Sequence, residues 1–357
     1  MDSDLNRHSR GTSVLLGLSG GVDSAAAAAL LMSAGYKVTA LTLRTWKDGE
    51  TQSEPYERAA HVARSLGIDH IEMDVTSAFY RDVVCPFVRS WRVGETPNPC
   101  VLCNPDFKFR LMLKVAEERG LDLIATGHYA RLTGDSVRPY LCRALDRKRD
   151  QSYFLYRLNR KVLNRTLFPL GSYSKSEIRA IASVFGDSVA QASDSQDICF
   201  LGDTKLRSFL AEQGVEDTPG FFLNTEGEII GEHTGSWHFS EGQRRRLGIA
   251  TGRRMTVLSK DTANNTVILG YEEDALIDAV ELSGVVSIDP LPEAFDALVQ
   301  IRSQGIARPA RITTRAGGNA SVIFPNPQRV VSPGQSAVFY WEDRVLGGGI
   351  VRKCLSR

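Results

Sequence analysis

Residues 17–24 read Gly-Leu-Ser-Gly-Gly-Val-Asp-Ser and connect an apolar run, residues 14–16, to an alanine-rich stretch, residues 25–31. This order predicts a strand, a glycine turn and a helix N-terminus in direct succession. Gly20 and Gly21 permit backbone conformations that a Cβ would exclude. The N–H groups of such a turn can converge on an anion, and the helix dipole adds partial positive charge. The motif therefore predicts a phosphate-binding loop in an α/β fold.

The loop has no lysine at the spacing of a Walker A motif. Without that charge near the terminal phosphates, the loop suits pyrophosphate as a leaving group. S-G-G-x-D-S after a strand resembles the PP-loop of the ATP pyrophosphatases, which cleave ATP between its α and β phosphates. The structural alternative is an ordinary glycine turn before a helix. Six matched positions in this context argue against that alternative.

Strand and helix patterns alternate from residue 12 to about residue 200, which predicts a doubly wound parallel sheet. The expected strands after the first are 37–44, 70–75 and 123–126, and the expected helices are 55–66, 107–119 and 174–185. Ligands of such sheets bind beyond the carboxyl ends of the strands. We therefore expect the loop at Ser19, the loop after Leu43 and the turn at Gly127 to surround one pocket.

The composition changes near residue 204, and this predicts three domains. Residues 1–203 form the expected PP-loop domain, 204–275 a small central domain that is rich in glycine and arginine, and 276–357 a C-terminal antiparallel β-barrel. The expected barrel strands are 297–301, 310–314, 320–324, 336–340 and 349–353.

The overall composition is that of an ordinary globular protein. The 357 residues are 42% hydrophobic and 24% charged, with a net charge of +1. No apolar run approaches the roughly 20 residues that span a bilayer, and the polar first ten residues predict no secretory signal. Six cysteines are too few for a disulfide scaffold, so we expect a cytoplasmic protein without a membrane partner.

Three cysteines have contexts that indicate chemistry. Cys100 and Cys103 lie in the proline-punctuated run T-P-N-P-C-V-L-C-N, and Cys199 lies in D-I-C-F. Cys103 is expected near a helix start, where the dipole would lower its thiol pKa. A C-x-x-C pair is either redox-active or a metal site. The remaining cysteines, Cys85, Cys142 and Cys354, are expected to be buried and structural.

Eight motifs occur in a characteristic order along the chain. They are G-L-S-G-G-V-D-S, T-P-N-P-C-V-L-C-N, A-T-G-H-Y-A, K-R-D-Q-S-Y-F-L, D-I-C-F, G-E-H-T-G, G-Q-R-R-R-L-G-I and P-G-Q-S-A-V-F-Y. Together they resemble the bacterial tRNA-specific 2-thiouridylases, the MnmA family of the PP-loop ATP pyrophosphatases, along nearly the whole chain. The resemblance implies ATP-dependent 2-thiolation of the wobble uridine in the tRNAs for Lys, Glu and Gln. It implies adenylation of the C2 oxygen, then persulfide sulfur transfer, with tRNA and a sulfur-donor protein (a cysteine desulfurase or a relay carrier) as partners.

The resemblance also implies roles for individual residues. ATP would lie on Gly17, Leu18, Ser19, Gly20, Gly21, Val22, Asp23 and Ser24, with Leu43 and Gly127 nearby and Mg²⁺ beside Asp23. Cys199 would carry the persulfide, and Cys103 would be its partner nucleophile, with a Cys103–Cys199 disulfide as a product. Asn98, Pro99 and Cys100 would line the base pocket. The tRNA contacts would be His128, Arg149, Asp150, Gln151, Arg302 and Gln335.

Cys100 departs from the family pattern, in which Asp is frequent at this position. Cys100, Cys103 and Cys199 could together hold an iron–sulfur cluster. The metal-free persulfide route is favoured here, because the frequent Asp makes a three-cysteine site dispensable. Two other readings use fewer of the motifs: a PP-loop synthetase for a small molecule, and a non-catalytic RNA-binding protein.

RNA binding in a near-neutral chain requires local positive charge. Three basic clusters are candidates: Arg143, Arg147, Lys148 and Arg149; Arg244, Arg245, Arg246, Arg253 and Arg254; and Arg302, Arg308, Arg311 and Arg315. Each cluster alone is more often a solvated face.

Overall fold

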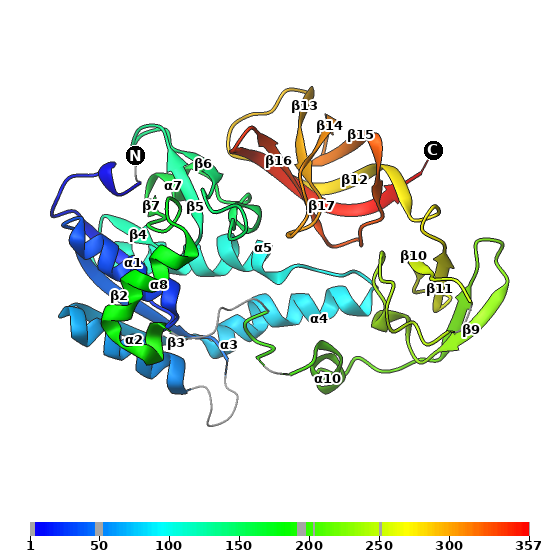
Figure 1. Cartoon of the computed structure of the whole chain (residues 1–357), viewed down its shortest axis with the longest axis horizontal. Helices are drawn as coiled ribbons and strands as arrows, with labels where there is room; N and C mark the ends of the chain where they lie inside the picture. Colours follow the sequence, from blue (N-terminus) through cyan, green and yellow to red (C-terminus); the bar gives the residue numbers. More distant parts are fainter. Residues whose placement is uncertain (1–3, 47–52, 191–197, 203, 250–251, 357) are drawn as a thin grey trace. The chain divides into compact units, whose positions relative to one another are not determined.

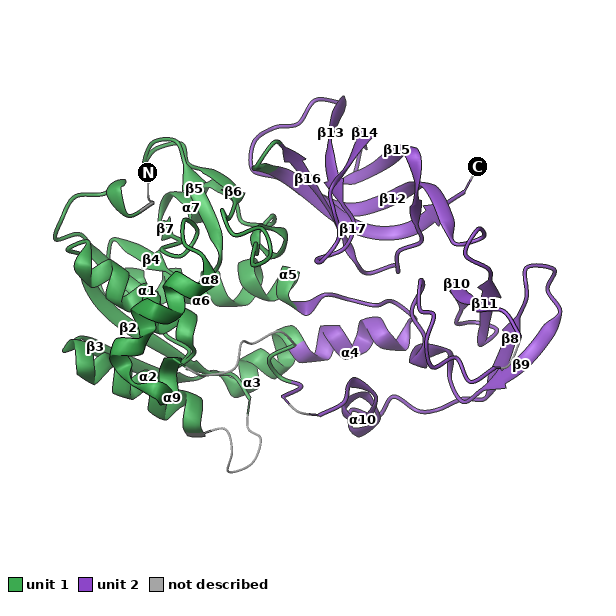
Figure 2. Cartoon of the chain, in the orientation of Figure 1, with its two compact units in different colours: residues 1–83, 100–200, 342–345 green, residues 84–99, 201–341, 346–357 purple. Residues whose placement is uncertain are grey.

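A computed structural model describes residues 4–46, 53–190, 198–202, 204–249 and 252–356 (Figure 1). The chain forms two compact units, drawn in different colours in Figure 2. Unit 1 contains residues 1–83, 100–200 and 342–345, and unit 2 contains residues 84–99, 201–341 and 346–357. The chain passes from unit 2 back into unit 1 between Pro99 and Cys100.

Unit 1 is built on a five-stranded parallel sheet, as the sequence predicts. Its strand order is β3-β2-β1-β4-β7. The strands are β1 (Ser13–Gly17), β2 (Lys37–Arg44), β3 (Asp69–Asp74), β4 (Leu123–Ala125) and β7 (Thr166–Leu167). Strand order runs outward in one direction from β1 to β3 and in the other from β4 to β7. The topological switch point, where such sheets bind ligands, therefore lies between β1 and β4.

Helices cover the sheet of unit 1. They are α1 (Val22–Ser33), α2 (Ser53–Leu66), α3 (Thr76–Phe79), α6 (Arg110–Glu118), α7 (Arg160–Asn164), α8 (Lys175–Ala182) and α9 (Asp187–Ala190). The alanines at 25–28 are completely buried and share a core with Leu16, Ile178 and Ala182. Their small side chains let α1 lie close to the sheet and to α8.

The segment that contains Cys100 and Cys103 forms a helix of mixed type. It begins as α5 (Pro99–Cys103), continues as a π-helix over Asn104–Phe109 and ends as α6. The helix expected at 107–119 therefore starts eight residues earlier. Phe107 and Phe109 are buried, and Asn104 donates from Nδ2 to the Phe154 carbonyl oxygen at 3.0 Å. These contacts fix the rotation of the helix that carries Cys100 and Cys103.

Unit 1 also contains a hairpin that the sequence analysis did not predict. Strands β5 (Ala130–Thr133) and β6 (Tyr140–Arg143) pair antiparallel directly after β4. Asp135 closes the connection by accepting from the backbone N–H groups of Val137 and Arg138. A loop, residues 144–152, then follows β6 and leads into the short 3-10 helix Ser152–Phe154.

The described residues of unit 2 form two α-helices, a 3-10 helix over Ser236–His238 and two β structures. The α-helices are α4 (Cys85–Arg92), which was not predicted, and α10 (Leu206–Glu212). A four-stranded sheet of order β10-β11-β8-β9 follows, from β8 (Gly220–Leu223), β9 (Ile229–His233), β10 (Thr256–Asp261) and β11 (Thr266–Gly270). Its hydrophobic core includes Phe222, Val257 and Leu269.

The last six strands form the antiparallel barrel that the sequence predicts. They are β12 (Leu276–Ser287), β13 (Ala294–Gln300), β14 (Arg308–Arg315), β15 (Asn319–Arg329), β16 (Ser336–Trp341) and β17 (Arg344–Leu355). Pairing of β12 with both β15 and β17 closes the barrel around Val280, Ile312 and Phe339. In the described part of the chain, no helix has the length and apolarity needed to cross a membrane.

Candidate nucleotide and sulfur-transfer site

The glycine loop between β1 and α1 has the geometry of an anion site. Gly20 has a φ of +77°, and a Cβ there would lie 1.9 Å from the Pro55 carbonyl oxygen. Ser24 Oγ lies 3.2 Å from both the N and the Oγ of Ser19 and holds the loop closed. Gly21 is the N-cap of α1 and provides no side-chain cap. The first N–H groups of the helix therefore remain available to an anion.

The segments expected around the nucleotide all lie at the carboxyl edge of the sheet. Gly17 ends β1, Leu43 lies one residue before the end of β2, and Gly127 follows β4. These three strands are neighbours in the sheet. A Cβ on Gly127 would lie 3.1 Å from the Asp23 carbonyl carbon and the Ser24 nitrogen, so the turn at 127 lies against the start of α1. The glycine loop, the end of β2 and the turn at Gly127 are thus neighbours within unit 1.

Asp23 is the charged group at this edge, and its partners were not predicted from the sequence. Lys175 donates from Nζ to Asp23 Oδ1 at 2.7 Å, and the Tyr129 hydroxyl donates to the same oxygen at 2.8 Å. Both donors are buried, with Lys175 9% and Tyr129 2% exposed. The loop that lacks a Walker lysine thus obtains a lysine from α8, about 150 residues later in the chain.

Local sequence explains where Lys175 stands. Ser174 caps α8 in a full capping box with Glu177, so the helix starts at Lys175. The expected helix at 174–185 begins at this cap, Ser174, one residue before the first helical residue, and its last turn is the 3-10 helix Ser183–Phe185. Nothing in the local pattern indicates that the first helical side chain reaches Asp23.

The thiols of Cys100 and Cys103 do not have the lowered pKa expected for a cysteine at a helix start. Burial raises the pKa of both, and the charge of Lys108 opposes this effect. The prediction of a lowered Cys103 pKa is therefore wrong for this arrangement. Desolvation by the surrounding protein outweighs the helix dipole, because the dipole acts only over the first turn.

Cys199 belongs to the same group of thiols. The pKa of the Cys199 thiol is raised to about 12, mainly because the thiol is buried. The negative charges that Cys100 and Cys103 would carry also raise this pKa, whereas the charge of Lys108 lowers it. The residue as a whole has an exposed surface, although its thiol is desolvated. The structure thus brings Cys100 and Cys103 close enough to Cys199 to raise its pKa, and Lys108 lowers the pKa of all three thiols. Residues 191–197 precede Cys199 in the chain and include Asp194 to Asp197. They lie outside the described residues.

The described residues contain no group of three or more His, Cys, Asp or Glu side chains placed to hold a metal ion. The iron–sulfur alternative therefore gains no support from this geometry. Cys142 and Cys354 have structural contacts instead. Cys142 is buried beside Thr133, and the Cys354 thiol donates to the Val331 carbonyl oxygen at 3.1 Å.

Four predicted site residues belong to unit 2 instead of unit 1: Asn98, Pro99, Arg302 and Gln335. Gln335 donates from Nε2 to the Thr96 carbonyl oxygen at 2.7 Å, and the Thr96 N–H donates to Pro333 at 2.8 Å. Gln335 therefore holds the loop that leads to Asn98 and Pro99. Arg302 donates from Nη2 to the Val330 carbonyl oxygen inside the barrel unit.

The predicted tRNA contacts of unit 1 differ in character. Asp150 is largely buried, and its carboxylate accepts from the Ala144 N–H and from the Ser152 N–H and hydroxyl, so it closes the 144–152 loop. Burial raises its pKa in spite of these bonds. Gln151 Oε1 accepts from the Tyr129 N–H at 2.9 Å. These two side chains position the loop, while Arg149 is only partly buried on it.

His128 is partly exposed, but its ring has the surroundings of a neutral histidine. Its pKa lies well below 6.5 because of burial, with the charge of Lys108 acting in the same direction. Its Nδ1 lies 2.7 Å from Thr126 Oγ1, and its ring lies against Phe109 and Phe168. The role of His128 towards tRNA stays a prediction.

Acidic partners neutralise part of each basic cluster. Arg147 pairs with Asp343 in unit 1. In unit 2, Glu272 pairs with Arg244, Glu273 with Arg253 and Asp296 with Arg311. The basic surface is therefore smaller than the arginine count suggests, and Lys148 becomes the prominent exposed cation of the first cluster.

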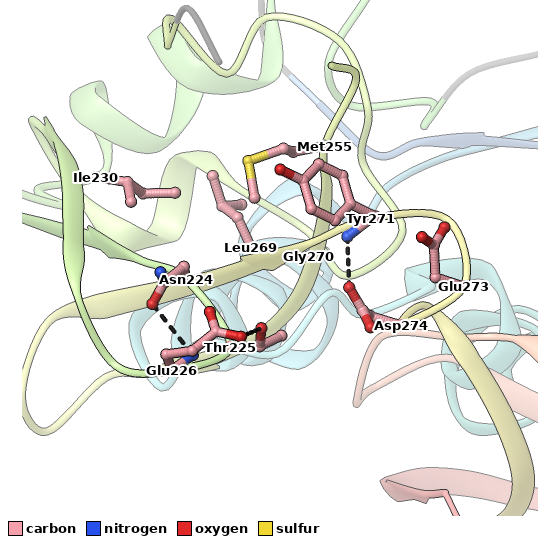
Figure 3. A pocket seen from close by; sticks show the side chains of 10 residues that line it. All are labelled: Asn224, Thr225, Glu226, Ile230, Met255, Leu269, Gly270, Tyr271, Glu273 and Asp274. Carbon is pink, nitrogen blue, oxygen red and sulfur yellow. Dashed lines mark hydrogen bonds between the residues drawn. The ribbon is translucent and has the colours of Figure 1, made fainter. Parts of the chain in front are cut away.

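A cavity of about 280 Å³ lies in the central part of unit 2, between β8, β9, β10 and β11 (Figure 3). Its floor includes Met255 and Leu269, and its rim carries Glu226, Glu273 and Asp274. Asp274 accepts from the Tyr271 N–H at 2.7 Å (Figure 3). None of the predicted site residues lines it, and carboxylates at the rim disfavour phosphate.

Family models match most of the chain in three consecutive segments. A tRNA methyl transferase HUP domain matches residues 12–203, a tRNA methyl transferase PRC-barrel domain residues 207–271, and an aminomethyltransferase beta-barrel domain residues 279–351. The HUP-domain match covers the whole parallel sheet and the three cysteines of interest.

Curated relatives match nearly end to end. The tRNA-specific 2-thiouridylase MnmA of Syntrophotalea carbinolica is 42% identical over 342 residues, 94% of this chain and 97% of that protein. The protein of the same name from Roseiflexus sp. is 40% identical over 369 residues, 95% and 99% of the two chains. Among solved structures, a 4-thiouridine synthetase–RNA complex with bound ATP is 18% identical. The match covers 57% of this chain and 50% of that chain, with a TM-score of 0.36. The chain therefore belongs to the MnmA family of tRNA-specific 2-thiouridylases.

Proposed function

We propose that this protein uses ATP to replace the C2 oxygen of a tRNA wobble uridine with sulfur, in the tRNAs for Lys, Glu and Gln. One observation carries the proposal. A single compact unit holds both a glycine loop at the switch point of a parallel sheet and the thiols of Cys100, Cys103 and Cys199, of which the first two lie near enough to raise the pKa of the third. Activation by ATP and sulfur transfer require these two groups of residues together.

The first step is activation of the base. The C2 oxygen of the uridine attacks the α-phosphorus of ATP and expels pyrophosphate, which turns a poor leaving group into a good one. The glycine loop, residues 17–24, would bind the pyrophosphate through its backbone N–H groups. Mg²⁺ would be held by Asp23, whose Oδ2 accepts no hydrogen bond from the described residues, and it would neutralise phosphate charge.

The second step is sulfur transfer. A sulfur-donor protein, a cysteine desulfurase or a relay carrier, would load Cys199 as a persulfide. The terminal sulfur attacks C2, and AMP leaves with the former C2 oxygen. The Cys103 thiolate then attacks Cys199 Sγ and breaks the S–S bond, so that the sulfur remains on the base and a Cys103–Cys199 disulfide forms. An external dithiol reduces this disulfide before the next cycle.

Binding of tRNA would use both units. Lys148 and Arg149 lie on the 144–152 loop of unit 1, and Asn98, Pro99, Arg302 and Gln335 belong to unit 2. We propose residues 1–203, 204–275 and 276–357 as the domain division. The target uridine has to leave the base stack of the tRNA before its C2 atom can react. Enzymes that modify a base usually extrude it from the stack in this way.

The test is mass spectrometry of nucleosides from unmodified tRNA after incubation with ATP and a persulfide donor. We expect 2-thiouridine, together with pyrophosphate and AMP, and none of these from Asp23→Asn. A synthetase for a small molecule would release pyrophosphate without modifying the tRNA. A non-catalytic RNA-binding protein would bind tRNA without consuming ATP.

A further inference from the structure

We propose that the loop of residues 146–154 couples RNA binding to the nucleotide loop, with Tyr129 and Lys175 as the positioning residues that connect it to Asp23. The inference rests on the proposed function, because it assumes that Lys148 and Arg149 meet tRNA phosphates. All residues concerned belong to unit 1.

Asp23 is held by two donors on one oxygen. Lys175 Nζ and the Tyr129 hydroxyl lie 2.7 Å and 2.8 Å from Oδ1. The Lys175 ammonium also lies 5.8 Å from the centre of the Tyr129 ring, so the two donors pack on each other. Asp23 is in the first turn of α1, inside the loop that binds phosphate. A shift of either donor changes the charge and the direction of the carboxylate that faces the nucleotide.

Both donors are bonded to the 146–154 loop. Gln151 and Tyr129 exchange two bonds: the Tyr129 N–H donates to Gln151 Oε1 at 2.9 Å, and the Gln151 N–H donates to the Tyr129 carbonyl oxygen at 2.8 Å. The Lys175 N–H donates to Asp146 Oδ2 at 3.3 Å. The loop therefore contacts Tyr129 and Lys175 separately, and both of these residues donate to Oδ1 of Asp23.

The loop is stiff enough to transmit a displacement. The Asp150 carboxylate accepts from Ala144 and Ser152, and Asp146 Oδ1 accepts from the Lys148 N–H at 3.2 Å. Ser152 is completely buried. The cations that would meet RNA thus stand on a backbone that is tied down on both sides of them.

The far end of the loop reaches the cysteine helix. Asn104, the residue after Cys103, donates from Nδ2 to the Phe154 carbonyl oxygen at 3.0 Å. One loop therefore contacts the partners of Asp23 at one end and the thiol-bearing helix at the other. RNA bound to it acts on both halves of the reaction, and a coupling between two sites is reciprocal.

The experiment measures the Kd of α,β-methylene-ATP, which cannot release pyrophosphate, for the full chain with and without saturating unmodified tRNA. We expect tRNA to tighten nucleotide binding about tenfold, within the range usual for coupled sites. Tyr129→Phe removes only the hydroxyl on Asp23, and Gln151→Met removes only the acceptor for Tyr129. In both variants the ratio should fall to about one, while the nucleotide alone binds within about threefold of the wild type. The tRNA concentration is raised to saturation for each variant, so a lost contact of Gln151 with tRNA does not by itself change the ratio.

Tyr36→Phe is the matched control. The Tyr36 hydroxyl is also buried, and it donates to the Leu5 carbonyl oxygen at 2.9 Å, which belongs to neither the glycine loop nor the 146–154 loop. It should keep the wild-type ratio. A wild-type ratio in both Tyr129→Phe and Gln151→Met overturns the coupling, as does a ratio of one in a wild-type protein that binds both ligands. A wild-type protein that binds neither ligand contradicts the proposed function itself.

Discussion

Lys175 and Asp23 form an ion pair of 2.7 Å between the starts of two helices, α8 and α1. Only 11% of the Lys175 side chain is exposed. A buried ammonium beside an anion-binding loop is well placed to stabilise negative charge that develops on phosphate.

Lys175→Met should therefore slow tRNA-dependent pyrophosphate release by about 100-fold, the usual cost of removing one donor to developing charge. The measurement is a coupled pyrophosphate assay at saturating tRNA. Lys161→Met, on the exposed side of α7, is the control and should leave the rate unchanged. A rate within twofold of the wild type in Lys175→Met would show that the ion pair is only structural.

Cys103→Ser and Cys199→Ser should each abolish thiolation, because the proposed transfer needs a thiolate at both positions. Nucleoside mass spectrometry provides the measurement. Cys142→Ser and Cys354→Ser should retain activity and lose about 1–3 kcal/mol of stability, since both thiols are desolvated structural groups. Full thiolation by Cys199→Ser would rule out the persulfide proposal.

Alkylation of Cys199 by iodoacetamide should accelerate with pH. With a pKa raised to about 12, the thiolate fraction rises about tenfold for each pH unit between 7 and 10. Lys108 opposes this rise in pKa, so Lys108→Met should raise the pKa further and slow alkylation at every pH in that range, whereas Lys108→Arg should not. The rates follow from mass spectrometry of the Cys199 peptide. A rate that levels off below pH 8 would contradict the raised pKa.

Neutralising Arg147, Lys148 and Arg149 together should weaken tRNA binding and reduce its salt dependence by about one unit of slope for each lost phosphate contact. The pairing of Arg147 with Asp343 refines this expectation. Lys148→Gln alone should reduce the slope more than Arg147→Gln alone. Filter binding at four salt concentrations measures both, and an unchanged slope in the triple variant would identify a solvated face.

Cys100→Asp should remain active, because the metal-free route needs only Cys103 and Cys199 as nucleophiles. Anaerobic purification with iron and sulfide analysis accompanies the assay. A stoichiometric iron–sulfur cluster in the active protein, together with an inactive Cys100→Asp variant, would favour the cluster route instead.

The sequence predicts those features that depend on local order. The strand–turn–helix at residues 13–33, the capped start of α8 and the barrel strands all follow from periodicity and from capping residues. The nucleotide edge follows as well, because consecutive parallel strands place their carboxyl ends together.

Features that depend on contacts distant in sequence could not be predicted in this way. The Lys175–Asp23 pair joins residues about 150 positions apart, and Arg147–Asp343 about 200. The Cys103 pKa was predicted from the local dipole, but burial by the rest of the unit decides its direction. The β5–β6 hairpin has a turn signal at Gly134 and Asp135, but its strands of four residues are too short to show a clear alternating pattern. Pro86 lies within the helical run that ends with α4, and a proline there argues against a helix.

The π-helical turn over Asn104–Phe109 holds one residue more than an α-helical turn would need. If the same residues formed a continuous α-helix without this wider turn, the turn before Asn104 would rotate by about 100° against the turn after Phe109. Phe107 and Phe109 would stay in the core, while Cys100 and Cys103 would point elsewhere. The orientation of the two thiols thus depends on this single π-turn, and a variant that replaces it with regular α-helix of the same length could fold well and still be unable to transfer sulfur.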